Sequence, residues 1–178
     1  MSIVSRETTE TSVRAELKVG RGLARVETSN PFLDHMMTAL ARYSGLDADI
    51  SARGDLKHHL VEDVALTVGR CFREIVPAGA ARYGTRTIPM DDALVQASVD
   101  IGGRPYYEGP LPSDLYDHWM RSFADESKVT IHIDVIRGFD RHHIVEAAFK
   151  ALGLALRDAL VDTGVTFSTK GRVSLTVE

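Results

Sequence analysis

The chain contains 178 residues, of which 44% are apolar and 26% charged, and its formal charge is −4. This composition is typical of a soluble globular protein with one sizeable core. Because there is no long basic run and no apolar stretch near the roughly 20 residues of a membrane-spanning helix, we expect no nucleic-acid or membrane partner. The polar residues 1–10 predict no secretory signal, and the single cysteine, Cys71, excludes an intrachain disulfide and indicates a cytoplasmic location.

The first half of the chain predicts two strands, a helix, a third strand and a second helix. The first helix begins behind Asn30, with Pro31 in its first turn, where proline is tolerated. The second helix has an apolar periodicity over residues 64–75, in which we expect Cys71 to be a small core residue rather than a nucleophile. The strands are predicted over Ser12–Val19, Leu23–Thr28 and Ala48–Arg53.

The second half again predicts a helix, a strand and a helix, and one further strand precedes them in the chain. Alternating apolar residues over Ala93–Asp100 predict that strand, and a Gly-Gly-Arg-Pro segment at 102–105 interrupts the chain after it. The next strand is predicted over Val129–Arg137, between the two helices, and a short strand over Arg172–Val177 comes last. No linker or low-complexity tract separates the halves, which indicates one compact α/β fold.

One order of motifs occurs twice. A histidine inside Asp-His-x-Met precedes a His-His-x-x-Glu motif by 23 residues in one copy and 24 in the other, and a glycine stands four residues before each His-His pair. We therefore interpret residues 1–178 as a single compact domain made of two repeated halves, roughly 1–90 and 91–178. The lone histidines are His35 and His118, and the two motifs are His58-His59-Leu60-Val61-Glu62 and His142-His143-Ile144-Val145-Glu146.

The spacing within each motif predicts metal binding. Residues four apart lie on one face of a helix, so His58 and Glu62 can bind one ion, as can His142 and Glu146. The second histidine of each pair diverges by about 100° and cannot easily serve the same ion. An exchange solves this problem: each ion takes a histidine and a glutamate from one motif, a histidine from the other motif, and one lone histidine. Such mixed ligands suit manganese, iron, cobalt or zinc.

The repeat also separates the remaining histidines. His35 and His118 occupy matched places in the two copies, whereas His132 has no counterpart. We predict the first two as ligands and His132 as a strand residue. A single His-His pair on a helix is usually a surface feature, but packing selects apolar residues and gives no reason for ionisable groups at matched positions.

A second set of residues predicts a phosphorylated substrate. Arg82 and Arg104 offer guanidinium groups, whose planar forks donate two parallel hydrogen bonds to a phosphate. Ser168, Thr169 and Lys170 add two hydroxyls and an ammonium, although they lack the frame of a Walker loop. Taken separately each feature is weak, because most arginines are simply surface residues.

Together these residues resemble the imidazoleglycerol-phosphate dehydratases, enzymes of histidine biosynthesis, over residues 6–177. The resemblance implies a duplicated α/β fold in which each half is a mixed sheet with helices packed on one face. It also implies a homo-oligomer of twenty-four subunits, with two manganese ions per active site shared between subunits. The matching pieces are Phe-Leu-Asp-His-Met (32–36), His-His-x-x-Glu-Asp (58–63), Arg-Tyr-Gly (82–84), Pro-Met-Asp-Asp-Ala-Leu (89–94), Gly-Arg-Pro-Tyr (103–106), His-His-Ile-Val-Glu-Ala-Ala-Phe-Lys (142–150) and Ser-Thr-Lys-Gly (168–171).

The resemblance also assigns roles to individual residues. The metal ligands would be His35, His58, His59, Glu62, His118, His142, His143 and Glu146. The phosphate contacts would be Arg82, Arg104, Ser168, Thr169 and Lys170, and Lys150 would reach the substrate. The base that removes a carbon proton would be Glu10, Glu62 or Glu146, and the sequence leaves this choice open.

These roles support a hypothesis for the reaction. The substrate's imidazole binds both ions as Lewis acids, a glutamate removes the proton from the carbon next to the ring, and hydroxide leaves the neighbouring carbon. The resulting enol becomes imidazole-acetol phosphate. The alternatives are a two-metal phosphoesterase and a metal-binding structural assembly protein. One departure from the family concerns the segment before His58, which is about two residues short and leaves open what orients His58 and His59.

Overall fold

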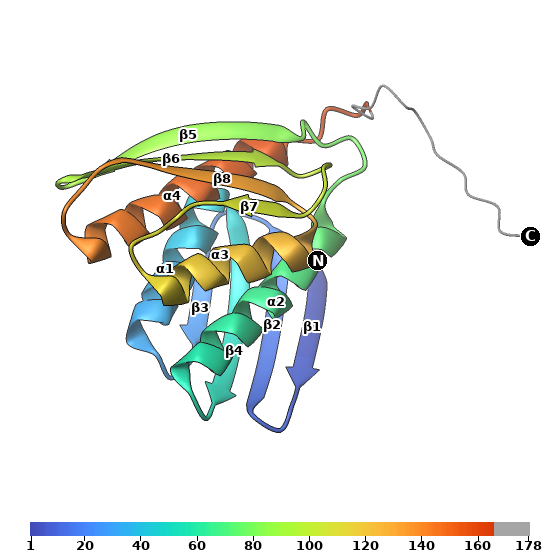
Figure 1. The fold of residues 1–178 in the computed structure, drawn as a ribbon. Helices are drawn as coiled ribbons and strands as arrows, with labels where there is room; N and C mark the ends of the chain where they lie inside the picture. The colour runs from blue at the N-terminus through green and yellow to red at the C-terminus, as the bar shows by residue number, and fades with distance from the viewer. Residues whose placement is uncertain (166–178) are drawn as a thin grey trace, which may run out of the picture.

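Two four-stranded sheets enclose four helices within residues 1–165, the part of the chain that the computed structural model describes (Figure 1). The first half contains β1 (Ser2–Glu7), β2 (Thr11–Val19), β3 (Ala24–Glu27), α1 (Pro31–Ser44), β4 (Leu46–Gly54) and α2 (Lys57–Ile75). The second half contains β5 (Tyr83–Met90), β6 (Ala93–Asp100), β7 (Tyr106–Glu108), α3 (Asp114–Ser127), β8 (Thr130–Arg137) and α4 (Arg141–Ala159).

The two sheets have the same topology. Their strand orders are β1-β2-β4-β3 and β5-β6-β8-β7, and in each sheet only the last pair is parallel. Helices α1 and α2 pack on the first sheet, α3 and α4 on the second, and the two helical layers meet where α2 contacts α3 and α1 contacts α4 (Figure 1). The predicted duplicated α/β fold, with helices on one face of each mixed sheet, is confirmed.

Three strands of the structure are missing from the sequence prediction. Strand β1 has no fully buried residue, β5 buries only Gly84, and β7 is three residues long. None of them therefore shows the clear apolar alternation by which a half-buried strand is recognised. The strand predicted over Arg172–Val177 lies outside the described residues.

Side-chain caps fix the start of two helices. Asn30 accepts hydrogen bonds from two backbone N–H groups in the first turn of α1. It directly precedes Pro31, where the sequence predicted the start of this helix. Asp140 does the same for α4, where it accepts from the N–H groups of His142 at 2.7 Å and His143 at 3.4 Å. The second His-His pair is therefore anchored at the first turn of its helix.

The core lies between each sheet and its helices and continues between the two helical layers. Trp119 is fully buried, and its ring lies 5.1 Å from that of Phe123 on the same helix and 4.7 Å from that of Phe149 on α4. Phe72 on α2 contacts Phe123 at 5.6 Å, so this aromatic group joins both halves. Cys71 is also fully buried, as predicted for a small core residue. None of the helices within residues 1–165 has the length and apolar character needed to cross a membrane.

Replacing Gly84 with alanine should destabilise the fold by about 1–3 kcal/mol, the usual cost of overpacking. Strand β5 approaches α4 so closely that a Cβ at Gly84 would overlap the backbone carbonyl of Ala155. The melting temperature should fall by several degrees in a thermal scan. Gly102→Ala is the control, because its Cβ would meet only the flexible side chain of Arg82. Equal melting temperatures for Gly84→Ala and the unchanged protein would contradict this prediction.

Candidate metal centres

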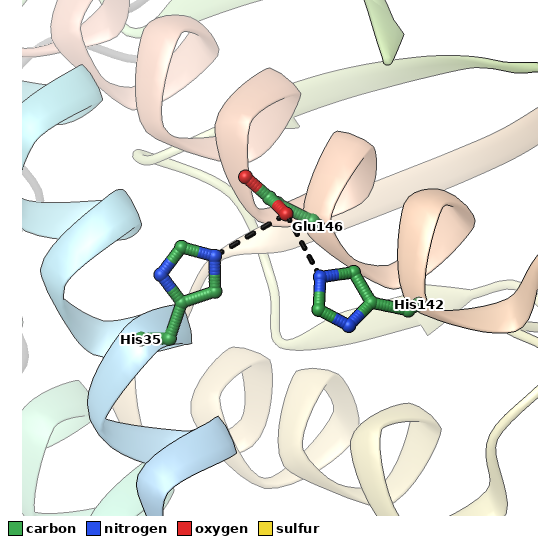
Figure 2. A group of neighbouring side chains, drawn as sticks. All are labelled: His35, His142 and Glu146. Carbon is green, nitrogen blue, oxygen red and sulfur yellow. Dashed lines mark hydrogen bonds and ion pairs between the residues drawn. The ribbon is translucent and has the colours of Figure 1, made fainter. Parts of the chain in front are cut away.

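The first group of possible ligands joins α1 to α4. His35 comes from α1, and His142 and Glu146 stand four residues apart on α4, with both imidazole rings pointing at the carboxylate (Figure 2). The Nε2 atoms of His35 and His142 lie 3.2 and 3.1 Å from Glu146 Oε2. The three ligand atoms lie within 4.8 Å of one another. This set can bind a divalent ion.

The second group joins α2 to α3 in the same way. His58 and Glu62 stand four residues apart on α2, and His118 comes from α3. The carboxylate oxygen Oε2 of Glu62 lies 3.6 Å from His58 Nε2 and 3.3 Å from His118 Nε2. His118 Nε2 is buried and makes no hydrogen bond within the described residues. An unsatisfied buried nitrogen facing a carboxylate and a second imidazole fits a metal ligand.

Each group therefore combines the motif of one half with the lone histidine of the other half. The repeat predicts His35 and His118 as ligands without saying which motif each joins, and the structure places each beside the motif of the other half. His132 lies instead on β8, with its ring 5.5 Å from that of Tyr106. Two imidazoles and one carboxylate suit a divalent transition ion and leave coordination positions for further ligands.

His59 and His143 join neither group within the described residues. His59 Nδ1 lies 2.9 Å from Asp55 Oδ1 and 3.5 Å from Glu10 Oε2. His143 Nδ1 lies 2.6 Å from Asp92 Oδ1. A carboxylate on one ring nitrogen is the usual support for a histidine that binds metal through its other nitrogen. The divergence predicted for neighbouring histidines is thus present in both pairs.

The supporting carboxylates also shift pKa values. The hydrogen bond to Asp55 raises the pKa of His59, and the hydrogen bond to Asp92 raises the pKa of His143, because a carboxylate stabilises the imidazolium. The same two hydrogen bonds lower the pKa of each aspartate. Metal binding needs the neutral imidazole, so protons compete with metal for both rings as the pH falls.

Glu146 has a further partner, and Glu62 has no counterpart to it within residues 1–165. Lys150 Nζ donates to Glu146 Oε1 at 2.8 Å, with side-chain exposures of 15% and 7%. Burial raises the pKa of Glu146, but the hydrogen bonds from Lys150 and His35 outweigh it, so the pKa lies below its ordinary value. Burial lowers the pKa of Lys150, and its hydrogen bond to Glu146 outweighs that effect. Both groups are charged at neutral pH.

The predicted phosphate-binding residues lie at the other end of the second sheet. Arg82 directly precedes β5, and its Nε and Nη2 donate to the two carboxylate oxygens of Asp100 at 2.7 and 2.9 Å. The backbone carbonyl of Arg104 accepts from Thr130 Oγ1 at 2.7 Å. From this end to the turn that holds Asp92, β5 spans on the order of 24 Å at about 3.4 Å per residue. One chain therefore does not bring these arginines to its own His143, and Ser168, Thr169 and Lys170 lie outside the described residues.

Sequence reasoning missed the supporting carboxylates. Asp55 stands four residues before His59, a spacing at which side chains on a helix meet, so the sequence contained this signal. It also gives His59 the support that the shortened segment before His58 had left open. Asp92 lies in the β5–β6 turn, 51 residues from His143, and no spacing rule could have found it. Asp63 was missed too: this buried carboxylate binds Arg6 at 2.7 Å and accepts from Thr11.

Comparisons with known proteins agree on one family. The family model described as imidazoleglycerol-phosphate dehydratase matches residues 28–156. A protein of that name from Pyrobaculum calidifontis is 46% identical over 182 residues, covering 93% of this chain and 96% of the relative. Another from Anaeromyxobacter is 40% identical, covering 94% of this chain and 91% of the relative.

Solved structures agree as well. A crystal structure of this enzyme from Pyrococcus furiosus, in complex with (S)-C348, has a TM-score of 0.86 and 41% identity, covering 96% of this chain and 100% of that one. The enzyme from Staphylococcus aureus gives a TM-score of 0.81 and 33% identity, covering 92% and 100%. The fold, the paired ligand groups and the relatives lead to one assignment: the chain belongs to the imidazoleglycerol-phosphate dehydratase family.

Proposed function

We propose that this chain is a hydro-lyase of histidine biosynthesis that converts imidazole-glycerol phosphate into imidazole-acetol phosphate and water. The observation that carries the proposal is the pair of His-His-Glu groups, each built across the duplicated halves of a fold shared with named dehydratases. The substrate is a small phosphorylated imidazole, and the cytoplasm is the expected location for such a biosynthetic step.

The ligand groups support two divalent ions per active site, and we assign them to manganese. His35, His142 and Glu146 would bind one ion, and His58, Glu62 and His118 the other. When bound, such ions supply Lewis acidity to the azole ring of the substrate. Their ligands also fix where the substrate's ring can lie.

A neighbouring copy of the chain would complete each group. His59 and His143 each have Nδ1 supported by an aspartate and lie outside their own chain's groups, and the Nε2 of His143 also lies 3.3 Å from the exposed Asp91. Phe139, which is 97% exposed, stands four residues before His143, and Leu56, which is 57% exposed, stands three before His59. A neighbouring copy that contacts these two places would bury both side chains, and burial of apolar surface favours association. These features support a homo-oligomer with shared sites, and we assign it the twenty-four subunits implied by the family.

The remaining steps belong to the protein's own side chains. Glu10 would accept the proton from the second carbon from the ring, and hydroxide would leave the carbon next to the ring, after which the enol becomes the ketone. This order exchanges the two carbons of the hypothesis drawn from the sequence, because only it places the ketone of imidazole-acetol phosphate on the second carbon. Lys150 would reach the substrate. The phosphate would be bound by Arg82 and Arg104. Because these arginines lie far from their own chain's His143, they would reach the site from another copy of the chain. Ser168, Thr169 and Lys170 are proposed as its other contacts.

The direct test is an ultraviolet assay for ketone formation from imidazole-glycerol phosphate. We expect product from the manganese-loaded protein, no product after treatment with a chelator, and recovery when manganese is added back. Release of inorganic phosphate without ketone would indicate a two-metal phosphoesterase instead. Absence of any turnover, with metal bound, would indicate a structural metal-binding assembly.

A further inference from the structure

We propose that Lys150 makes the two metal groups unequal, so that the group with Glu146 binds its divalent ion more weakly than the group with Glu62. The inference rests on the metal binding proposed above. It concerns a difference between the two groups that the duplicated motifs do not reveal, because the motifs themselves match residue for residue at every ligand.

The difference lies one helical turn beyond each glutamate. Lys150 stands four residues after Glu146, on the same face of α4. The corresponding place after Glu62 on α2 is taken by Leu66, which carries no charge. The duplicated ligand sets therefore have different neighbours, one with an ammonium group and one with an apolar side chain.

The ammonium group of Lys150 is fixed beside the ligand. Its Nζ lies 2.8 Å from Glu146 Oε1, 3.3 Å from the sulfur of Met90 and 5.6 Å from the ring centroid of Tyr43. The Lys150 side chain is only 15% exposed. Among the described residues, Glu146 is the one carboxylate that forms an ion pair with Lys150. The ammonium group therefore has no second carboxylate to which it could turn.

The two oxygens of Glu146 are divided between these partners. Oε2 faces the Nε2 atoms of His35 and His142 at 3.2 and 3.1 Å, whereas Oε1 accepts from Lys150. Lys150 thus partly neutralises the carboxylate charge that would attract an ion bound between the imidazoles. Because Lys150 contacts the same carboxylate, its ammonium group would also repel an ion bound to Glu146.

Burial strengthens this effect. An ion, Glu146 and Lys150 together carry two net positive charges around a carboxylate that is 7% exposed, where water screens poorly. An ion with Glu62 carries one net positive charge beside a carboxylate that is 36% exposed. Burial also strengthens the attraction between Glu146 and the ion, but Lys150 neutralises much of that attraction. The net balance favours the group with Glu62.

The experiment uses the assembled, full-length protein, stripped with a chelator and then equilibrated with graded manganese concentrations, with bound metal counted by mass spectrometry. For the unchanged protein we expect two classes of site whose dissociation constants differ on the order of tenfold or more. Lys150→Met should tighten the weaker class and bring the two together. Lys150→Arg, which keeps the charge, should retain two classes.

The reciprocal variant moves the charge to the other group. Leu66→Lys places an ammonium one turn beyond Glu62 at a half-buried position that can accept it, and it should weaken the tighter class. One uniform class in the unchanged protein, or two classes unaffected by both Lys150→Met and Leu66→Lys, would overturn the inference while leaving two metal sites in place. Failure to bind manganese at all would instead remove the proposed function.

Discussion

Two inactive variants, His59→Ala and His142→Ala, should regain dehydratase activity when they are assembled into one oligomer. With the proposed ligand sets, each variant alone would remove one ligand of the same ion from every site. Its activity should fall by more than about 100-fold, which exceeds the usual loss when only a ligand's supporting residue is changed. His142 belongs to a group built within one chain, whereas His59 faces away from it. A site with His142 from one variant and His59 from the other has all its ligands.

The experiment coexpresses the two variants with different affinity tags and purifies oligomers that carry both. Random assembly gives about a quarter of the sites one intact copy of each ligand, so activity should return to about that fraction. His35→Ala mixed with His142→Ala is the matched control. Both residues belong to the same group of one chain, so mixing cannot repair it. Recovery in the control, or none in the test pair, would mean that the sites are not shared in this way.

Glu10→Gln should lower kcat by about 10²–10⁴-fold, the usual contribution of general base catalysis, while the bound manganese stays constant. The carboxylates of Glu62 and Glu146 both face two imidazoles and would be occupied as ligands in the proposed site. Glu10 is 53% exposed and lies 3.5 Å from His59 Nδ1, where a proton acceptor can meet a substrate held beside that ring. Its amide analogue keeps the shape and removes the basic oxygen.

Turnover and metal content should be measured on the same preparations. Glu7→Gln is the matched control, because Glu7 lies on the same β1–β2 hairpin and its side chain binds only Ser12 among the described residues. An unchanged kcat for Glu10→Gln would exclude Glu10 as the base. A loss of metal would instead indicate that Glu10 supports His59, the ring it contacts.

The features that the sequence predicted are those governed by local spacing. The four-residue step places Glu62 below His58 on one turn of a helix, and the matched repeats select His35 over His132 without any knowledge of the fold. Strand β6, with its alternating buried residues, was predicted over Ala93–Asp100, the bounds that the structure has. Strands that bury little, such as β1 and β5, gave no such pattern.

What the sequence could not predict depends on tertiary structure. Asp92 supports His143 only because the β5–β6 turn reaches the start of α4. His118 lies beside His58 and Glu62 only because the two helical layers pack against each other. The separation of Arg82 from His143 follows from the length of β5, a strand that the sequence did not predict.

The layers described above also bear on what half of this chain could do alone. Each ligand group draws its lone histidine from the opposite half, through the α1–α4 and α2–α3 contacts. A polypeptide with one sheet and two helices would therefore carry every kind of ligand and yet assemble neither group. Only by pairing face to face with another such unit could it gather them, and in this protein a covalent connection makes that encounter permanent.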